Sequence, residues 1–233
     1  PRRFDVRLLE AASETTANAS IGDLNGDGHP DIVLVKGRHW PLKSVVLLGD
    51  GRGNFTPGAP LPQEANRSYS APLADLNGDG HLDFILSNDR PDEKLVFLGD
   101  GKGGFRRAGT FGAATWPTRN AVVADLNGDG FPDIAVANRG SSTYICLNDG
   151  KGRFPTSTVL GPEGASTLVT GDLDGDGAQV VGAGAGRLVD LSGDFVFLAA
   201  DVGQHDARAF RHEPLRNRDR KSTRLNSSHV KRS

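Results

Sequence analysis

The stretch DLNGDGHPD occupies residues 23–31, and the rest of the chain repeats around it. It recurs as DLNGDGHLD at residues 75–83 and as DLNGDGFPD at residues 125–133, and a shorter copy, DLDGDG, occupies residues 172–177. In each complete copy, oxygen-bearing side chains stand at positions 1, 3, 5 and 9, and glycines stand at positions 4 and 6. This shared spacing points to one chemistry for all the copies.

The spaced oxygens are the donor set that calcium prefers, since Ca²⁺ takes six to eight hard oxygen ligands at about 2.3–2.6 Å. Glycine permits the sharp turn that lets alternate side chains point inward. Position 7 varies between His29, His81 and Phe131, as expected if its backbone carbonyl is the ligand. Three carboxylates within nine residues would repel one another without a cation. Asp, Asn and Gly also gather in turns for local reasons, but three copies of one pattern favour metal binding.

The residues after each loop distinguish it from an EF-hand, which needs a bidentate Glu at position 12 and helices on both sides. Position 12 is Leu34, Leu86 or Val136. Each lies in a short apolar run that is typical of a buried strand. The loops are therefore predicted to join two strands, which also argues against a dockerin.

A second repeated feature fixes the period of the chain. The stretch LGDGRGNF at residues 48–55 recurs as LGDGKGGF at 98–105 and LNDGKGRF at 147–154. Asp-Gly between apolar runs is a strong hairpin signal. The Phe that ends each copy recurs after 50 and then 49 residues, and Phe4 fits as the end of an earlier repeat. Periods of this length indicate solenoids, propellers or arrays.

One unit, taken from Phe55, contains four predicted strands and no segment with helical periodicity. The strands are expected from Phe55 towards residues 58–60, and at residues 70–74, 84–86 and 94–98. Four strands at a period near 50 match a propeller blade. The predicted fold is all-β: a partial β-propeller of about four four-stranded blades, incomplete at both ends, with a disordered C-terminal tail.

The paired motifs resemble the FG-GAP/VCBS repeat of integrin-α-like β-propellers, and residues 58–60 echo the Gly-Ala-Pro of that name. The resemblance covers about residues 4–177 and implies calcium bound in a hairpin of each blade. The implied ligands are, in the first loop, Asp23, Asn25, Asp27, the His29 carbonyl and Asp31; in the second, Asp75, Asn77, Asp79, the His81 carbonyl and Asp83; in the third, Asp125, Asn127, Asp129, the Phe131 carbonyl and Asp133. The fourth loop keeps only Asp172, Asp174 and Asp176, because its position 9 falls on Val180 or Gln179.

Composition divides the chain into an acidic body and a basic tail. The net charge is −2, but residues 208–233 hold 9 Lys and Arg against 2 acids, which leaves the body at −9. The only cysteine, Cys146, excludes an internal disulfide framework and lies in an apolar run, where a core role is expected. The predicted domains are the propeller at residues 1–200 and a tail at 201–233. The chain contains no Met, so we expect a fragment or a processed product.

The tail has a separate interpretation. Residues 219–229 resemble the translation of a sequencing adapter, and our hypothesis is that the tail is an assembly artefact. The same hypothesis extends to residues 178–218, which would then lie outside the native reading frame. A basic arm that binds nucleic acid is the alternative.

These features predict a calcium-binding, non-catalytic module for adhesion or ligand binding, outside the cell or at its surface, where calcium is abundant. Its expected partner is an extracellular protein or carbohydrate, with no nucleic acid and no membrane span. One alternative is the propeller portion of a secreted hydrolase or lyase, although neither Gly-x-Ser-x-Gly nor His-Glu-x-x-His is present. Another is a lectin-like carbohydrate binder that uses Trp40 or Trp116 as a stacking platform.

Overall fold

A computed structural model describes residues 6, 8–11, 14–161, 164–172, 179–183 and 187–190. The chain divides into two units, residues 1–200 and residues 201–233. The predicted disordered or artefactual tail lies outside the described residues, as do Phe4 and most of residues 178–218. The division of the chain into a propeller and a tail therefore stays a prediction.

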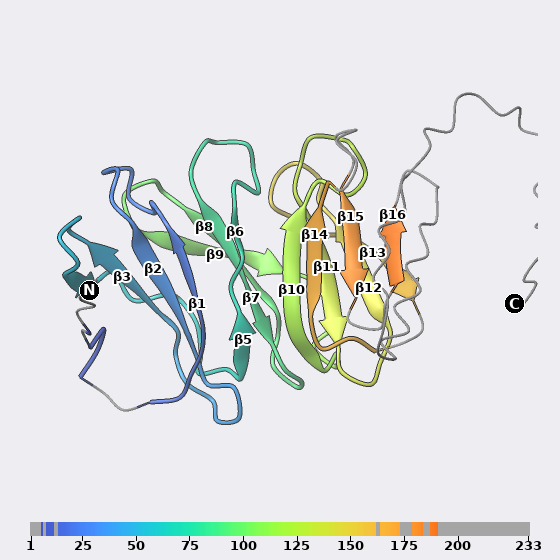
Figure 1. Cartoon of the computed structure of the whole chain (residues 1–233), viewed down its shortest axis with the longest axis horizontal. Helices are drawn as coiled ribbons and strands as arrows, with labels where there is room; N and C mark the ends of the chain where they lie inside the picture. The colour runs from blue at the N-terminus through green and yellow to red at the C-terminus, as the bar shows by residue number, and fades with distance from the viewer. Residues whose placement is uncertain are drawn as a thin grey trace, which may run out of the picture. The chain divides into compact units, whose positions relative to one another are not determined.

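The described residues form strands, turns and irregular segments, and no helix occurs among them, as predicted (Figure 1). They group into four antiparallel sheets, which we call blades 1 to 4. Blade 1 contains β1 (Thr16–Gly22), β2 (Asp31–Lys36), β3 (Val45–Gly49) and β4 (Phe55–Pro57); blade 2 contains β5 (Ser68–Ser70), β6 (Leu73–Ala74), β7 (Asp83–Asn88), β8 (Leu95–Gly99) and β9 (Phe105–Thr110); blade 3 contains β10 (Thr118–Ala124), β11 (Asp133–Asn138), β12 (Thr143–Leu147) and β13 (Thr156–Gly161); blade 4 contains β14 (Leu168–Gly171), β15 (Val180–Ala183) and β16 (Arg187–Asp190).

Each blade is a meander in which neighbours in sequence pair side by side, and this confirms the all-β, propeller-like repeat fold. In blade 2 the first strand is split at Pro72, so that β5 and β6 both pair with β7. Blade 4 has three strands within the described residues. One detail differs from the sequence prediction: the strand that starts at Phe55 or Phe105 completes the preceding sheet and does not open the next. The tight Asp-Gly turn causes this, because a short hairpin pairs the two strands that it joins.

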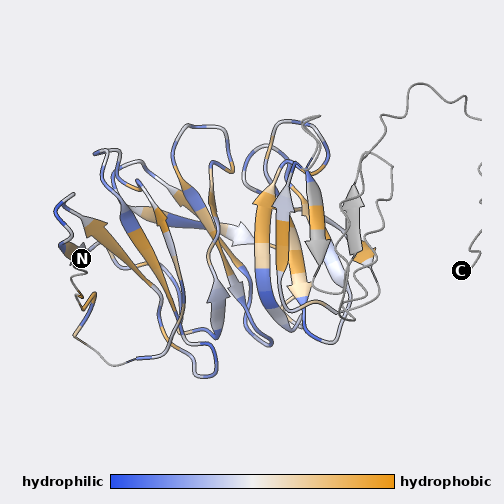
Figure 2. Cartoon of the chain, viewed as in Figure 1, coloured by the Kyte–Doolittle hydropathy of each residue, from blue (hydrophilic) through white to orange (hydrophobic). Residues whose placement is uncertain are grey.

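The hydrophobic core lies between successive blades. Val33 and Val35 of β2 pack in one cluster with Phe84 and Phe97 of blade 2. Ile85, the residue after Phe84 in β7, belongs instead to the next cluster. Alternate residues of a middle strand therefore face the blades on its two opposite sides. The middle strands β2, β7 and β11 are consequently buried on both faces, and Figure 2 shows the apolar residues concentrated in these inner strands. No helix in the described part of the chain is long and apolar enough to cross a membrane.

Each blade has two distinct ends, because its strands run antiparallel. The repeated nine-residue loops lie at one end, which we call the loop end, together with the Asp-Gly turns. The hairpin turns after β2, β7 and β11, at residues 37–44, 89–94 and 139–142, lie at the other, which we call the turn end. Figure 1 shows the loops at the top of the view and these turns at the bottom.

Candidate metal loops

The three complete loops join the first two strands of their blades, as predicted. Residues 23–31 connect β1 to β2, residues 75–83 connect β6 to β7, and residues 125–133 connect β10 to β11. In the fourth copy Asp172 directly follows β14, while Asp174 and Asp176 lie outside the described residues. Strands flank every loop, so the helix–loop–helix frame of an EF-hand is excluded for the three complete copies.

Position 1 organises the backbone of each loop. In the first loop the Asp23 carboxylate accepts hydrogen bonds from the backbone N–H groups of Gly26 at 2.8 Å and Gly28 at 2.9 Å. Both glycines have positive φ, 75° and 80°, which other residues rarely adopt. These N–H groups hold the pKa of Asp23 below its usual value, with the bond from Gly28 as the largest cause. Asp75 and Asp125 accept the equivalent bonds in the other loops.

Positions 3 and 5 are also held by local hydrogen bonds. The Asn25 side chain donates to Asp27 Oδ2 at 3.0 Å, and Asn25 Oδ1 accepts the Asp27 N–H at 3.0 Å. Asp27 Oδ1 accepts the backbone N–H of His29 at 2.8 Å. The second and third loops repeat all three contacts. The side-chain oxygens of the loops are therefore prearranged in the same way in three blades.

Position 9 has a different environment from the other oxygen positions. Asp31, Asp83 and Asp133 are completely buried. Asp83 accepts the Leu76 N–H on one oxygen and the Gly99 N–H on the other, both at 2.8 Å. The carboxylate thus ties the loop to the third strand of its own blade, and Asp31 and Asp133 do the same. Sequence reasoning placed these residues among the ligands but did not predict this structural role.

The buried carboxylate also experiences the negative charge of its loop. Burial raises the pKa of Asp83 to about 6, and the charges of Asp79 and Asp75 raise it further, against the lowering effect of its two N–H donors. The pKa of Asp133 is raised for the same reasons, burial first and then its neighbours Asp129 and Asp125. Each of these loops therefore concentrates negative charge on one short segment.

The donor set fits a hard divalent cation, although the side chains alone do not complete a site. Within the described residues no three His, Cys, Asp or Glu side chains converge as a group that could hold a metal ion. An ion in a loop would therefore need the Asn oxygen of position 3 and the carbonyl of position 7 as well as carboxylates. Each carboxylate oxygen of position 9 accepts one hydrogen bond and retains a second lone pair for a cation.

The loops also form the joint between neighbouring blades. The position 2 side chains Leu24 and Leu76 are buried and pack into the core shared with the next blade. The Leu24 carbonyl accepts the N–H of Gly103, which lies in the Asp-Gly turn of blade 2. The Leu76 carbonyl accepts a hydrogen bond at 2.8 Å from the Asn148 side chain of blade 3. Sequence reasoning missed Asn148, because its position is Gly49 and Gly99 in the other repeats.

The Asp residues of the Asp-Gly turns have a turn-forming role, as expected. Asp50 Oδ1 accepts the N–H groups of Arg52 and Asn54 at 2.8 and 3.0 Å. A hydrogen bond from the Asn54 side chain, followed by these two backbone bonds, lowers the pKa of Asp50 to about 2. The imidazole of His29 lies against Gly51 of the same turn, where a Cβ would stand 2.6 Å from its Nδ1.

Other residues singled out by the sequence have core or surface positions. Cys146 is buried in the cluster between blades 2 and 3, and burial raises the pKa of its thiol to about 12, as suits a core residue. Trp116 is partly buried and stacks on Tyr144 with ring centroids 4.1 Å apart. Trp40, in contrast, is 71% exposed.

Comparison with known proteins agrees with this geometry. The FG-GAP-like repeat matches three times in succession, at residues 23–86, 75–136 and 125–181. The chain belongs to the FG-GAP-like repeat family. Each match begins at the first Asp of one complete loop, and the first two extend into the strand after the following loop.

Solved structures include similar chains, whereas no curated protein matches. One of the similar structures is the V. cholerae biofilm matrix protein Bap1, with 20% sequence identity and a TM-score of 0.44. The match covers 79% of this FG-GAP-like chain and 31% of the Bap1 chain. The chain thus spans about a third of the length of that protein.

Proposed function

We propose that this chain is a calcium-stabilised, non-catalytic propeller module that acts outside the cell in adhesion or ligand binding. The observation that carries the proposal is the threefold repetition of one oxygen-lined loop over a buried carboxylate, Asp31, Asp83 or Asp133. Membership of the FG-GAP-like repeat family supports a binding role. Calcium in each loop would balance the carboxylates and hold the loop against the next blade.

The proposed stabilisation has a definite size. A ligand that binds only the folded state at ten times its dissociation constant adds about 1.4 kcal/mol of stability per site. Extracellular modules commonly bind calcium with dissociation constants of about 10⁻⁴–10⁻³ M, which suits a binding step outside the cell. Because the Leu24 and Leu76 carbonyls accept bonds from the next blade, ordering a loop also orders an interface.

Thermal unfolding of the full chain in calcium and in chelator tests the proposal. Calcium should raise the melting temperature, and chelator should reverse the shift. Asp79→Asn should reduce the calcium-dependent shift, because it removes one loop charge. Asp100→Asn is the matched control: it removes a carboxylate from the adjacent Asp-Gly turn, whose oxygen accepts bonds from Lys102 and Gly104, and should leave the shift intact. An identical melting curve with and without calcium would refute structural calcium.

A further inference from the structure

The turn after β2, residues 37–44, presents an aromatic ring to solvent at the turn end of blade 1. Trp40 is 71% exposed, whereas Trp116 finds a stacking partner in Tyr144. A large exposed aromatic side chain contributes little to folding, and its flat apolar ring is available to stack on a ligand. The sequence offered both Trp residues as stacking platforms, and in the structure Trp40 is the more exposed of the two.

The backbone under Trp40 is fixed from both sides. Gly37 donates its N–H to Thr15 at 3.0 Å, and Arg38 donates to the Ser68 carbonyl at 3.2 Å. Leu42 and Asn66 exchange two hydrogen bonds at 3.0 and 3.1 Å, which pin the turn to the segment entering blade 2. The platform is therefore preorganised, and a ligand that binds there would not have to order the loop.

Cationic residues flank Trp40 in the sequence and recur in the corresponding turns of the turn end. Arg38 and Lys43 lie in the same turn and are exposed. Arg90 and Arg139 are exposed in the corresponding turns of blades 2 and 3. None of these four has an ion pair with any residue that the structure describes.

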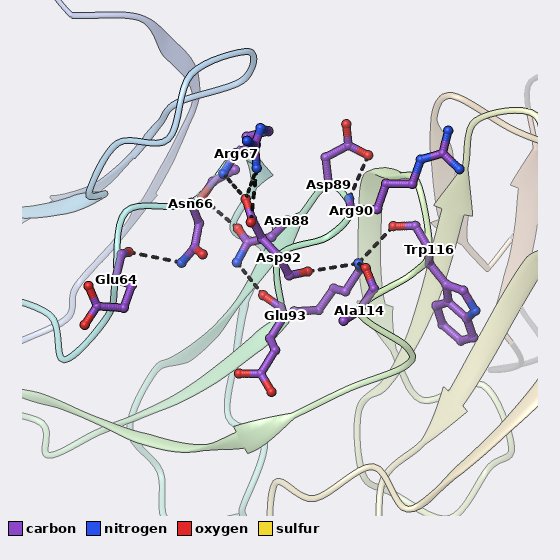
Figure 3. Close-up of polar contacts among 12 residues, drawn as sticks. Glu64, Asn66, Arg67, Asn88, Asp89, Arg90, Asp92, Glu93, Ala114 and Trp116 are labelled. Carbon is purple, nitrogen blue, oxygen red and sulfur yellow. Dashed lines mark hydrogen bonds and ion pairs between the residues drawn. The ribbon is translucent and has the colours of Figure 1, made fainter.

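Most of the acids that the structure describes at the turn end are, in contrast, paired with other cations. Glu10 and Glu14 contact Lys36, Asp92 contacts Arg67 and Asp89 contacts Arg119, whereas Glu93 contacts Arg107 of β9. Figure 3 shows the Arg67–Asp92 contact beside Asp89 and Arg90. Glu64 is the exposed acid without such a pair in the described segment 61–68. Among the residues that the structure describes, the unpaired charge of this end is thus mainly positive, opposite in sign to the loop end.

We propose that the turn end, with Trp40, Arg38 and Lys43 at its centre and Arg90 and Arg139 beside it, binds an acidic polysaccharide. A sugar ring would stack on Trp40, and carboxylates along the polymer would meet the cations of successive turns. The small number of cations, on a body of net charge −9, does not suit nucleic acid, which requires a strongly basic surface. The inference rests on the ligand-binding role proposed above and assigns it a face and a class of ligand.

Binding of hyaluronan oligosaccharides to the full chain, measured calorimetrically in calcium, tests this inference. We expect binding that weakens as salt rises and that is absent for neutral dextran oligosaccharides. Trp40→Ala should weaken it by at least about tenfold. The double variant Arg38→Asn, Lys43→Gln should weaken it several-fold; Asn suits position 38, where φ is 48°.

The matched control is Arg52→Gln with Lys102→Gln, which removes two exposed cations from the loop end and should leave binding unchanged. Protection of Trp fluorescence from acrylamide by hyaluronan gives a second measure that needs no variant. The inference is overturned if the hyaluronan does not bind, if the loop-end control loses as much affinity as the turn-end variant, or if single-stranded DNA binds better. A calcium-dependent melting shift on the same samples reports the proposed calcium role independently, so that either proposal can fail alone.

Discussion

The loop end and the turn end of the blades are formed by the same strands, but they differ in how far their contacts repeat from blade to blade. At the loop end, the buried Asp of position 9 accepts a 2.8 Å bond from the last residue of the third strand, or in blade 3 from Asn148 directly after it, in all three complete blades. At the turn end, the last residue of the second strand is Lys36, Asn88 or Asn138, and the contacts of Lys36 differ from those that the two Asn residues share. Lys36 forms ion pairs with acids that precede β1. The side chains of Asn88 and Asn138 instead donate hydrogen bonds to backbone carbonyls of their own hairpins.

The difference indicates which end is constrained by shared chemistry and which is free to vary. A cation site fixes the identity and spacing of its oxygens, so the loops cannot diverge without loss of the ion. A hairpin turn requires only residues that can adopt the backbone dihedral angles of the turn. We infer that stability resides at the loop end and specificity at the turn end, and four substitutions test this division.

The largest effect is expected for Asp83→Ala at the loop end, measured by urea unfolding in chelator. The substitution leaves the N–H groups of Leu76 and Gly99 without their acceptor in a buried site. The free energy of unfolding should fall by about 3 kcal/mol. Asp79→Ala, in the exposed part of the same loop, should cost much less in chelator. Equal losses would show that position 9 has no special structural role.

Lys94 at the turn end should give stability an unusual dependence on pH. Its buried ammonium donates to the carbonyls of Asp92, Ala114 and Trp116 at 3.2, 3.1 and 2.9 Å, and Figure 3 shows this cluster. Burial lowers the pKa of Lys94 to about 8, against the opposing charges of Asp89 and Asp92.

Between pH 8 and the ordinary lysine pKa of 10.5, the unfolded chain keeps a proton that the folded chain releases. Stability of the wild type should therefore rise with pH relative to Lys94→Met, by about 2–3 kcal/mol at pH 10. Unfolding of both proteins at pH 7 and pH 10 measures this difference. A constant difference would mean that the three carbonyls hold the ammonium in its charged form.

Asn148→Ala should break the joint between blades 2 and 3 at the loop end. The Asn148 side chain donates to the Leu76 and Pro132 carbonyls at 2.8 and 2.9 Å and is nearly buried. We expect a loss of about 2 kcal/mol in chemical unfolding. Arg153→Ala removes an exposed ion pair from the same turn and should cost under about 0.5 kcal/mol. A loss no larger than that of the control would show that Asn148 does not stabilise the joint between blades 2 and 3.

Arg119→Met should have the smallest effect of the four. The guanidinium pairs with Asp89 across blades 2 and 3 and lies 4.5 Å from the centroid of the Tyr69 ring. Because the pair is only partly exposed, a loss of about 1 kcal/mol is expected. Arg107→Met, in the more exposed pair with Glu93, serves as the reference and should be close to neutral. Identical unfolding curves for the two variants would contradict an inter-blade role for Arg119.

The features that repeat along the chain could be predicted from the sequence, whereas the contacts that occur in a single blade could not. The spacing of Asp23, Asn25 and Asp27 and of the later copies predicted the loops, the flanking strands and the blade period. The contacts of Lys36, Asn148 and Arg119 could not be predicted, because each depends on residues that only the stacking of blades brings together. The assignment of each Phe strand to the preceding sheet was missed although the Asp-Gly turn signalled it.

The most direct test of the account is to count bound calcium by equilibrium dialysis of the full chain. The account predicts about one ion for each of the three complete loops, and one fewer for a protein with Asp75→Ala and Asp79→Ala. The Asp100→Asn protein should bind as many ions as the wild type. A wild-type chain that binds no calcium at millimolar concentration would contradict the account.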